Sequence, residues 1–515
     1  MTDYQPNKAA RDLDQDEARL AALGHQQELE RNFSFFSMLG LAFSILNSWT
    51  ALASSLSVGL PSGGPVAVIW GLVTAGVGSL SLAASNAEFL SAYPTSAGQY
   101  HWAAIISPPE WVANVSWVTG WINVGGWVAL SASGGTLGGS LFLGIITMYN
   151  PDFRPEQWHL FLLFLLYTVV GFFLNLFLGS GLPFMTKIAL VWSVCGFLAT
   201  AITVLATGAP DFQPASFVFG EFINSTGWPG GIAFLLGLLQ GGLSLTGFDA
   251  VAHMIEEIPQ PCIRGPRIMI ACVAMGLGTG FLFLVCLLFI IKDVDAVVSS
   301  PTGPLAEIYL EATNSTAATV CLLIFPMVCL VFGTLGIMAT STRMVYAFAR
   351  DGGLPFSRIF ARVHPRWGIP VNALLLTNAI VVIFGLVYLG STSALNAILS
   401  AAVISLTLSY AVAPAINCIR RRSMLPPNRA FVLPEWLGWT CNLVGIAYAL
   451  VIAVFLLFPP VSDVTGSSMN YAVVAFAIIV FISTVQWFVD GRRNFNGPVF
   501  DESAFVTVTG DQEAK

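Results

Sequence analysis

Two stretches of the chain place polar side chains and glycines inside segments that are otherwise apolar. The first contains Asn47, Ser48, Trp49 and Thr50, and the second contains Ser244, Thr246, Gly247, Phe248 and Asp249. If a helix breaks at such a stretch, one half presents free N–H groups and the other presents free C=O groups, which bind the anionic and cationic parts of a small solute. These residues are therefore the candidate binding residues, with Asp249 set apart by its charge.

Asp249 is the one carboxylate that we place well inside an apolar segment. Burying such a group in hydrocarbon costs a few kcal/mol, so it is a functional candidate by default. We expect Asp249 to couple solute movement to a proton or another ion, and the alternative is that it caps the helix that follows it. Other ionisable residues near segment ends are explained by snorkelling or by a solvated vestibule: Glu88, His253, Glu256, Glu257 and Arg343.

A third glycine-rich stretch, residues 134–139, has a different interpretation. Small residues let helices approach closely in lipid, and we interpret this stretch as a packing surface of that kind. The binding interpretation is preferred for the other two stretches because they fall in the first and sixth apolar segments. Those positions correspond if segments one to five and six to ten are inverted repeats.

The chain shows no pattern of a catalytic or metal site. Its five histidines lack metal-ligand spacing, and neither a phosphate-binding loop nor a Gly-x-Ser-x-Gly motif occurs. The eight cysteines, seven of them in or at the ends of apolar stretches, give no disulfide or metal framework. The sequence therefore predicts a protein that is not an enzyme, has no cofactor and no metal, and moves its solute with a gradient rather than ATP.

The composition places most of the chain in lipid. Of the 515 residues, 56% are hydrophobic and only 10% are charged, against roughly 25% charged in an average soluble domain. So many apolar residues cannot be hidden in one water-facing core, which excludes a soluble globular protein. The net charge of −7 argues against a nucleic-acid partner, which needs a basic surface.

Twelve apolar segments, most of them long enough to cross about 30 Å of hydrocarbon as a helix, follow from residue 33 onward. Segments of this length exclude a β-barrel, whose strands alternate over about ten residues. We therefore expect an all-α integral membrane protein with 12 transmembrane helices. The predicted spans are 34–59, 66–90, 111–147, 159–179, 187–208, 231–252, 267–291, 319–349, 371–389, 395–418, 438–458 and 470–489.

The distribution of Lys and Arg predicts the orientation. With both termini cytosolic, 19 of the 21 basic residues fall on the cytosolic side, and only Arg154 and Lys292 fall outside. Three Asn-x-Ser/Thr motifs are sorted by the same topology. Asn224 and Asn314 lie in outer loops and are the expected glycosylation sites, whereas Asn114 lies at the cytosolic start of the third span.

The ends of the chain are read as cytosolic tails, residues 1–32 and 491–515. The first is rich in charge and lacks the apolar core of a cleaved signal peptide, so we interpret it as a solvated tail. Leucines near helical spacing allow a short helix within residues 13–30, and a mostly disordered tail is the equal alternative.

Four motifs in order resemble one family. Residues 20–35, 87–102, 247–257 and 339–355 are similar to the amino acid/choline (GABA permease-type) transporters of fungi, within the amino acid–polyamine–organocation superfamily. The resemblance covers about residues 20–490. It implies a LeuT-type 5+5 inverted repeat with two extra helices: a ten-helix transport core at 33–418 with repeats near 34–208 and 231–418, then a cytosolic loop and helices eleven and twelve at 419–490.

The resemblance also assigns roles. Helix one would unwind at Asn47–Ala51 and helix six at Ser244–Gly247, around a small amine or amino acid such as choline or 4-aminobutyrate. Proton coupling is expected, although the helix-five lysine that couples some superfamily members is replaced here by Trp192–Cys195. The triplet that starts at Asn47 looks like choline-type members, and Trp49 would suit a quaternary ammonium, which binds over an aromatic face.

Two alternatives remain open at the level of the sequence. A non-transporting amino-acid sensor would keep the same scaffold and binding site, and a transporter of an alkaloid-like secondary metabolite would keep the same mechanism. Among these, secondary active transport across the plasma membrane is the preferred reading.

Overall fold

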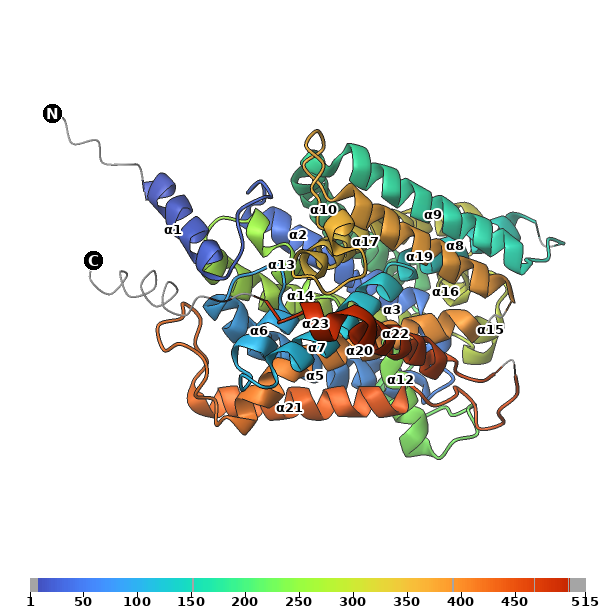
Figure 1. Cartoon of the computed structure of the whole chain (residues 1–515). Coiled ribbons are helices and arrows are strands. Elements are labelled where there is room, and N and C mark those ends of the chain that lie inside the picture. The colour runs from blue at the N-terminus through green and yellow to red at the C-terminus, as the bar shows by residue number, and fades with distance from the viewer. Residues whose placement is uncertain (1–7, 151, 391–392, 467, 499, 501–515) are drawn as a thin grey trace.

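The computed structural model describes residues 8–150, 152–390, 393–466, 468–498 and 500, which form a bundle of helices (Figure 1). Within these residues, eleven segments are long and apolar enough to cross a membrane, and the sixth predicted span contains a shorter apolar helix, α12. The twelve predicted spans therefore all fall on helical segments. Nine of them are α5 (Gly64–Ala92), α9 (Gln157–Phe177), α10 (Leu182–Gly208), α14 (Pro261–Ile290), α17 (Thr316–Arg350), α19 (Val371–Gly390), α20 (Ser393–Ile419), α21 (Glu435–Phe455) and α22 (Ala472–Gln486).

Three spans consist of more than one helix. The first contains α2 (Phe35–Leu46), α3 (Ser48–Ser54) and α4 (Leu56–Gly59). The third contains α7 (Val112–Leu130) and α8 (Ser133–Tyr149), and the sixth contains α12 (Gly230–Ser244) and α13 (Ala250–His253). The first and sixth spans are those in which the sequence predicts breaks.

Shorter helices mark the two ends of the bundle (Figure 1). We call the end that carries α1 (Lys8–Ala22) and α6 (Gln99–Ile105) the α1 face, and the opposite end, with α15 (Val294–Ser299) and α16 (Pro304–Thr313), the α15 face. The other short elements are η1 (Gly179–Gly181), α11 (Ala215–Gly220), η2 (Ile255–Glu257), α18 (Ser357–Phe360), η3 (Trp487–Gly491) and α23 (Arg492–Asn494).

Burial separates central helices from peripheral ones. In the most apolar part of each segment, 89% of residues are buried for the first span and for α20, but only 33% for α9, α10 and α19. In the last span the share is 11%. Because apolar side chains are as stable in lipid as in a protein interior, such helices can expose theirs at the periphery. The first span therefore lies at the centre of the bundle, where a broken helix is sheltered from lipid.

The N-terminal segment is not the solvated tail that the sequence suggested. Helix α1 ends before Gly24, where the N–H of His25 bonds the carbonyl of Leu20 in a left-handed glycine cap. The chain then runs along the α1 face, where the buried carboxylate of Asp16 accepts hydrogen bonds from Arg31 at 3.2 Å and from the backbone N–H of Gln260 at 2.9 Å. Residues 1–7 and 501–515, the rest of the two expected tails, lie outside the described residues.

Candidate functional site

The break in the first span occupies a single residue. Asn47 adopts the left-handed conformation (φ 45°, ψ 37°), which asparagine tolerates better than most residues. Helix α3 then restarts at Ser48, and its first backbone bond joins the N–H of Ala51 to the carbonyl of Asn47 at 2.8 Å. The break is thus shorter than the implied Asn47–Ala51. Even so, the first N–H groups of α3 have no hydrogen-bond acceptor within their own helix.

The break in the sixth span is longer. Helix α12 ends at Ser244 and α13 begins at Ala250, with Thr246, Gly247 and Phe248 between them. Gly247 has φ +99°, and a Cβ added there would lie 2.9 Å from Cγ2 of Ile45. Only glycine meets both requirements without strain. The expected unwinding after Ser244 is therefore present in the structure.

The two breaks contact each other. The hydroxyl of Ser48 donates to the backbone oxygen of Ser244 at 2.9 Å. Nearby hydroxyls bond to carbonyls within their own span, Thr50 to Asn47 at 2.9 Å and Thr246 to Gly242 at 2.7 Å. The structure thus brings together the two stretches that the sequence selected, and the Ser48 hydroxyl supplies a donor to the carbonyl at the end of α12.

A small cavity of about 20 Å³ lies beside the break in the first span. A space of roughly 10–15 Å³ holds one water molecule, so this cavity is too small for an amino acid in the present conformation. The Nδ2 of Asn47 is buried with no hydrogen-bond partner among the described residues, which leaves a donor available at the cavity wall. The cavity is lined by Ile45, Leu46, Asn47, Ala51, Leu130, Ser133, Gly134, Leu137, Leu243, Leu330, Gly333, Thr334 and Ile337.

Larger hollows continue from this cavity toward the α15 face. A cavity of about 180 Å³ shares Leu137 and Leu243 with the small one and reaches Thr302, in the loop before α16. A third, of about 470 Å³, shares Ser57 and Val58 with the second. Hollows therefore follow one another from the first break toward the α15 face.

The ring of Trp49 lies away from these cavities. Its Nε1 donates to the hydroxyl of Ser193 in α10 at 2.9 Å, and its ring packs edge-on against Phe283 in α14 with centroids 5.0 Å apart. The side chain is fully buried. In this conformation Trp49 therefore does not form the aromatic wall that the resemblance implied, because it fills the space between α3 and its neighbours.

Asp249 lies beside the second break as a completely buried acceptor of hydrogen bonds. Its Oδ1 accepts from the hydroxyl of Tyr410 at 2.6 Å, and its Oδ2 accepts from Gln99 at 3.0 Å and Trp127 at 3.1 Å, with Nε2 of His253 also at 3.1 Å. Its side chain makes no capping bond to α13, although it occupies the N-cap position. The cap alternative is therefore wrong, because these partners occupy the carboxylate.

The sequence did not single out the partners of Asp249. Gln99 comes from α6, Trp127 from α7 and Tyr410 from α20, and nothing in their local pattern marks them, except that Gln99 falls in the motif at residues 87–102. Tyr410 also accepts a hydrogen bond from the backbone N–H of Gly247 at 3.1 Å. The carboxylate is thus joined through one hydroxyl to the break itself.

Comparison of the sequence with known proteins identifies the family of this chain. The amino acid permease family model matches residues 33–482. The chain belongs to the amino acid permease family. It is 38% identical over 438 residues, 84% of this chain and 96% of the relative, to a Macrophomina phaseolina protein whose name describes an amino acid/polyamine transporter.

Two further relatives of this permease span nearly its whole length. The choline transporter of Saccharomyces cerevisiae is 33% identical over 492 residues, 94% of this chain and 85% of the relative. The amino-acid permease BAT1 of Arabidopsis thaliana is 30% identical over 511 residues, 95% and 97% of the two chains. The protein is therefore a multi-pass membrane transporter and not an enzyme, and the recognised family is confirmed.

The permease closes its α1 face with buried ion pairs rather than with the solvated side chains expected from the sequence. Glu256 bonds Arg350 at 3.0 Å, and Glu257 bonds Arg343 at 3.0 Å. Burial raises the pKa of Glu256, but the Arg350 guanidinium and hydrogen bonds from Arg350 and Ser96 lower it more, to about 2. Glu256 therefore stays ionised at all physiological pH values.

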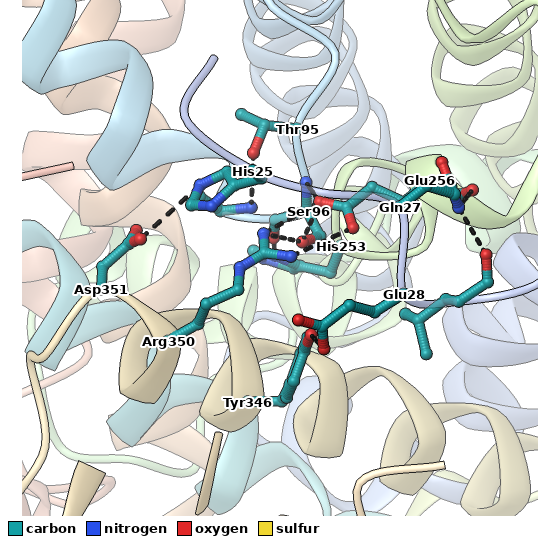
Figure 2. A network of polar contacts seen from close by, with 12 residues as sticks. His25, Gln27, Glu28, Thr95, Ser96, His253, Glu256, Tyr346, Arg350 and Asp351 are labelled. Atoms are coloured by element: carbon teal, nitrogen blue, oxygen red, sulfur yellow. Dashed lines mark hydrogen bonds and ion pairs between the residues drawn. The ribbon is translucent and has the colours of Figure 1, made fainter. Parts of the chain in front are cut away.

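The N-terminal segment covers this cluster (Figure 2). Gln27 donates to the backbone oxygen of Glu256 at 3.0 Å, and Glu28 accepts from the hydroxyl of Tyr346 at 2.6 Å. His25 lies 3.6 Å from Asp351. Residues 25–28 thus add a layer of polar contacts over the closed end of the bundle.

Glu88 forms a second buried cluster at this end. Its carboxylate bonds Arg422 at 2.7 Å and Arg429 at 2.6 Å, and it also accepts from the backbone N–H of Leu433 at 3.1 Å. The position of Glu88 near the end of its span is therefore explained by these buried ion pairs and not by snorkelling. Glu88 joins the end of α5 to the loop between α20 and α21.

The three asparagines of the Asn-x-Ser/Thr motifs are all exposed. Asn224 and Asn314 are exposed, in the loop before α12 and at the end of α16, whereas Asn114 is an exposed residue in α7. Modification of Asn224 and Asn314 stays a prediction. At residues 134–139 the packing interpretation agrees with the contacts, since a Cβ added at Gly138 would lie 2.4 Å from the ring of Tyr167.

Proposed function

We propose that this permease is a secondary active transporter of a small amine or amino acid that works by alternating access around the breaks at Asn47 and Gly247. The observation that carries the proposal is the direct contact of the two broken spans, Ser48 to Ser244, beside a cavity with an unpaired amide donor. The N–H groups at the start of α3 suit a carboxylate, and the carbonyls at the end of α12 suit an ammonium group. An amino acid or 4-aminobutyrate would use both ends, and choline only the second.

The proposed cycle begins from the state described above. The cavities open toward the α15 face, and the α1 face is closed by the ion pairs of Glu256 and Glu257. Substrate would enter from the α15 face, and the α1 face would then open. We assign the α1 face to the cytosol and the protein to the plasma membrane, with residues 34–208 and 231–418 as the two repeats that move against each other.

The substrate class is tested by uptake into vesicles that contain only this protein. The panel is radiolabelled choline, 4-aminobutyrate, amino acids and a methylated alkaloid, with an inward proton gradient imposed or collapsed. The proposal predicts saturable, gradient-dependent accumulation of one class. Binding without accumulation would instead indicate a sensor, and accumulation of the alkaloid alone would indicate movement of a secondary metabolite.

The coupling role of Asp249 is tested with Asp249→Asn. Asparagine keeps the shape of the side chain and one acceptor oxygen for the donors around it, but it carries no charge and cannot exchange a proton. We expect this variant to exchange labelled for unlabelled substrate while net uptake loses its dependence on external pH. The matched control is Asp463→Asn, at an exposed position far along the chain in the loop before α22. A wild-type pH profile in Asp249→Asn would make Asp249 a structural residue.

A further inference from the structure

His253 is held between two acceptors at the closed end of the site. It lies one helical turn after Asp249, and both side chains are completely buried. Its Nε2 lies 3.1 Å from Oδ2 of Asp249, and its Nδ1 lies 2.8 Å from the backbone oxygen of Ser96. A carbonyl oxygen only accepts hydrogen bonds, so Nδ1 of His253 carries a hydrogen.

The contact between His253 and Asp249 requires a second proton. At 3.1 Å, Nε2 and Oδ2 cannot both present lone pairs, so one proton lies between them. Either the imidazole is charged and the carboxyl is ionised, or both groups are neutral.

The other partners of Asp249 decide between these states. Trp127 can only donate, and the hydroxyl of Tyr410, which accepts from the N–H of Gly247, has its own hydrogen to donate to Oδ1 of Asp249 at 2.6 Å. The amide of Gln99 is oriented the same way, since its oxygen accepts from Asn123 at 2.8 Å. A carboxyl group surrounded by donors is favoured in its ionised form. The proton therefore belongs to His253.

Charge balance supports the same assignment. The titratable groups that face the pair from other elements are the thiol of Cys272 in α14 and the phenol of Tyr410 in α20, and neither kind of group carries a positive charge. Beyond Ser96, Glu256 of η2 is neutralised by Arg350 of α17. Within the described residues, His253 is the one basic side chain within ion-pair distance of the Asp249 carboxylate. An ionised carboxylate buried this deeply needs a partner of opposite charge.

We propose that His253 is the proton-binding residue of this transporter, an imidazolium that neutralises Asp249 in the closed α1 face and gives up its proton when that face opens. The inference rests on the proposed secondary transport and names the group that carries the coupled proton. A proton moves from Nε2 to water on the α1 side, and no other bond changes.

The position of His253 explains how proton release and opening are linked. Through Nδ1 it ties α13 to Ser96, whose hydroxyl and N–H both donate to Glu256, at 2.6 and 3.1 Å (Figure 2). Loss of the proton leaves Nε2 facing a carboxylate with no hydrogen between them, which repels α13 from its place. Toward the cavity, Asp249 reaches Gly247 through Tyr410, and Gly247 packs against Ile45 of the cavity wall.

The test measures protons and substrate together in vesicles of the full-length protein with an internal pH-sensitive dye. The wild type is expected to move protons with substrate, and His253→Gln is expected to move substrate with a proton-to-substrate ratio near zero. Glutamine can donate to Ser96 but cannot bind a proton. The control is His101→Gln, a second completely buried histidine at the α1 face, which should keep the wild-type ratio.

The outcomes separate the two proposals. A wild-type ratio in His253→Gln overturns this inference and leaves secondary transport intact, and equal loss in His101→Gln removes its assignment to His253. Uptake by the wild type with no proton movement overturns proton coupling altogether. If His253→Gln does not fold, infrared pH-difference spectra of the wild type decide: an imidazole signal supports the assignment, and a protonated carboxyl band assigned by Asp249→Asn overturns it.

Discussion

The position of the Trp49 ring is determined by packing against neighbouring helices and not by contact with a ligand. The ring fills the space beside Phe283 and Phe197, and its N–H satisfies Ser193. The same residue type in the same span would serve equally well as an aromatic wall, so its identity alone does not separate the roles. The direction of the side chain does, and that direction is set by α10 and α14.

The packing role of Trp49 leads to a stability prediction. Trp49→Ala should destabilise the protein by about 3–5 kcal/mol, because it leaves a large cavity, whereas Trp49→Phe should cost less because much of the ring remains. Thermal unfolding of the purified protein measures both, with Trp436→Ala, at a position 70% exposed, as the control. Unchanged stability together with weaker binding of choline would instead place the ring at the substrate.

At the scale of elements, buried ion clusters fasten helices together at the α1 face. Glu88 holds α5 against the loop that follows α20, and Asp16 holds the N-terminal segment against the start of α14. These contacts join segments hundreds of residues apart in the chain, so they act on the arrangement of helices and not on any one of them.

Removal of the Glu88 charge should weaken the contact between α5 and the loop that follows α20. Glu88→Gln leaves Arg422 and Arg429 buried without their counter-charge, and breaking a buried pair in this way costs about 3–5 kcal/mol. We expect a lower unfolding temperature and faster protease cleavage between residues 420 and 433. Glu110→Gln, at an exposed acid, is the control. Equal unfolding temperatures and cleavage rates in the two variants would contradict a stabilising role for the Glu88 ion pairs.

Weakening the contact of Asp16 should free the N-terminal segment without unfolding the bundle. Asp16→Asn removes the charge that Arg31 pairs with, so we expect protease to cut residues 17–31 faster while the unfolding temperature changes little. Glu17→Gln is the matched control, because Glu17 is the exposed neighbour. If both variants are cut at the wild-type rate, Asp16 does not hold the segment in place.

At the scale of the whole molecule, both ends of the described chain meet on one face. Phe500 packs edge-on against Tyr93, and the segment at His25 reaches Asp351 on the same α1 face. A chain that crosses the membrane an even number of times has both termini on the same side, and the predicted number of spans, twelve, is even. Tags at both termini should therefore be protected from protease in intact cells, while a tag after Asp463 should be cut. Cleavage of an N-terminal tag from outside would contradict the orientation.

The sequence alone determined the spans and the two breaks. Hydrocarbon thickness sets a minimum helix length, and backbone groups in lipid must bond within their own segment, so length and hydropathy are sufficient to locate each span, although not the division of the third span into α7 and α8. The glycine at 247 and the asparagine at 47 are visible locally because a left-handed or broken backbone selects such residues.

Only the tertiary structure decided what the polar side chains do. Gln99, Trp127 and Tyr410 meet at Asp249 from three different helices, and no spacing along the chain encodes that meeting. For the same reason Glu88 and Asp16 look like solvated charges in the sequence and are buried in the fold. The hydropathy pattern of a segment indicates whether lipid or water surrounds its helix. The hydrogen-bond partners on other helices depend on how those helices are rotated and packed.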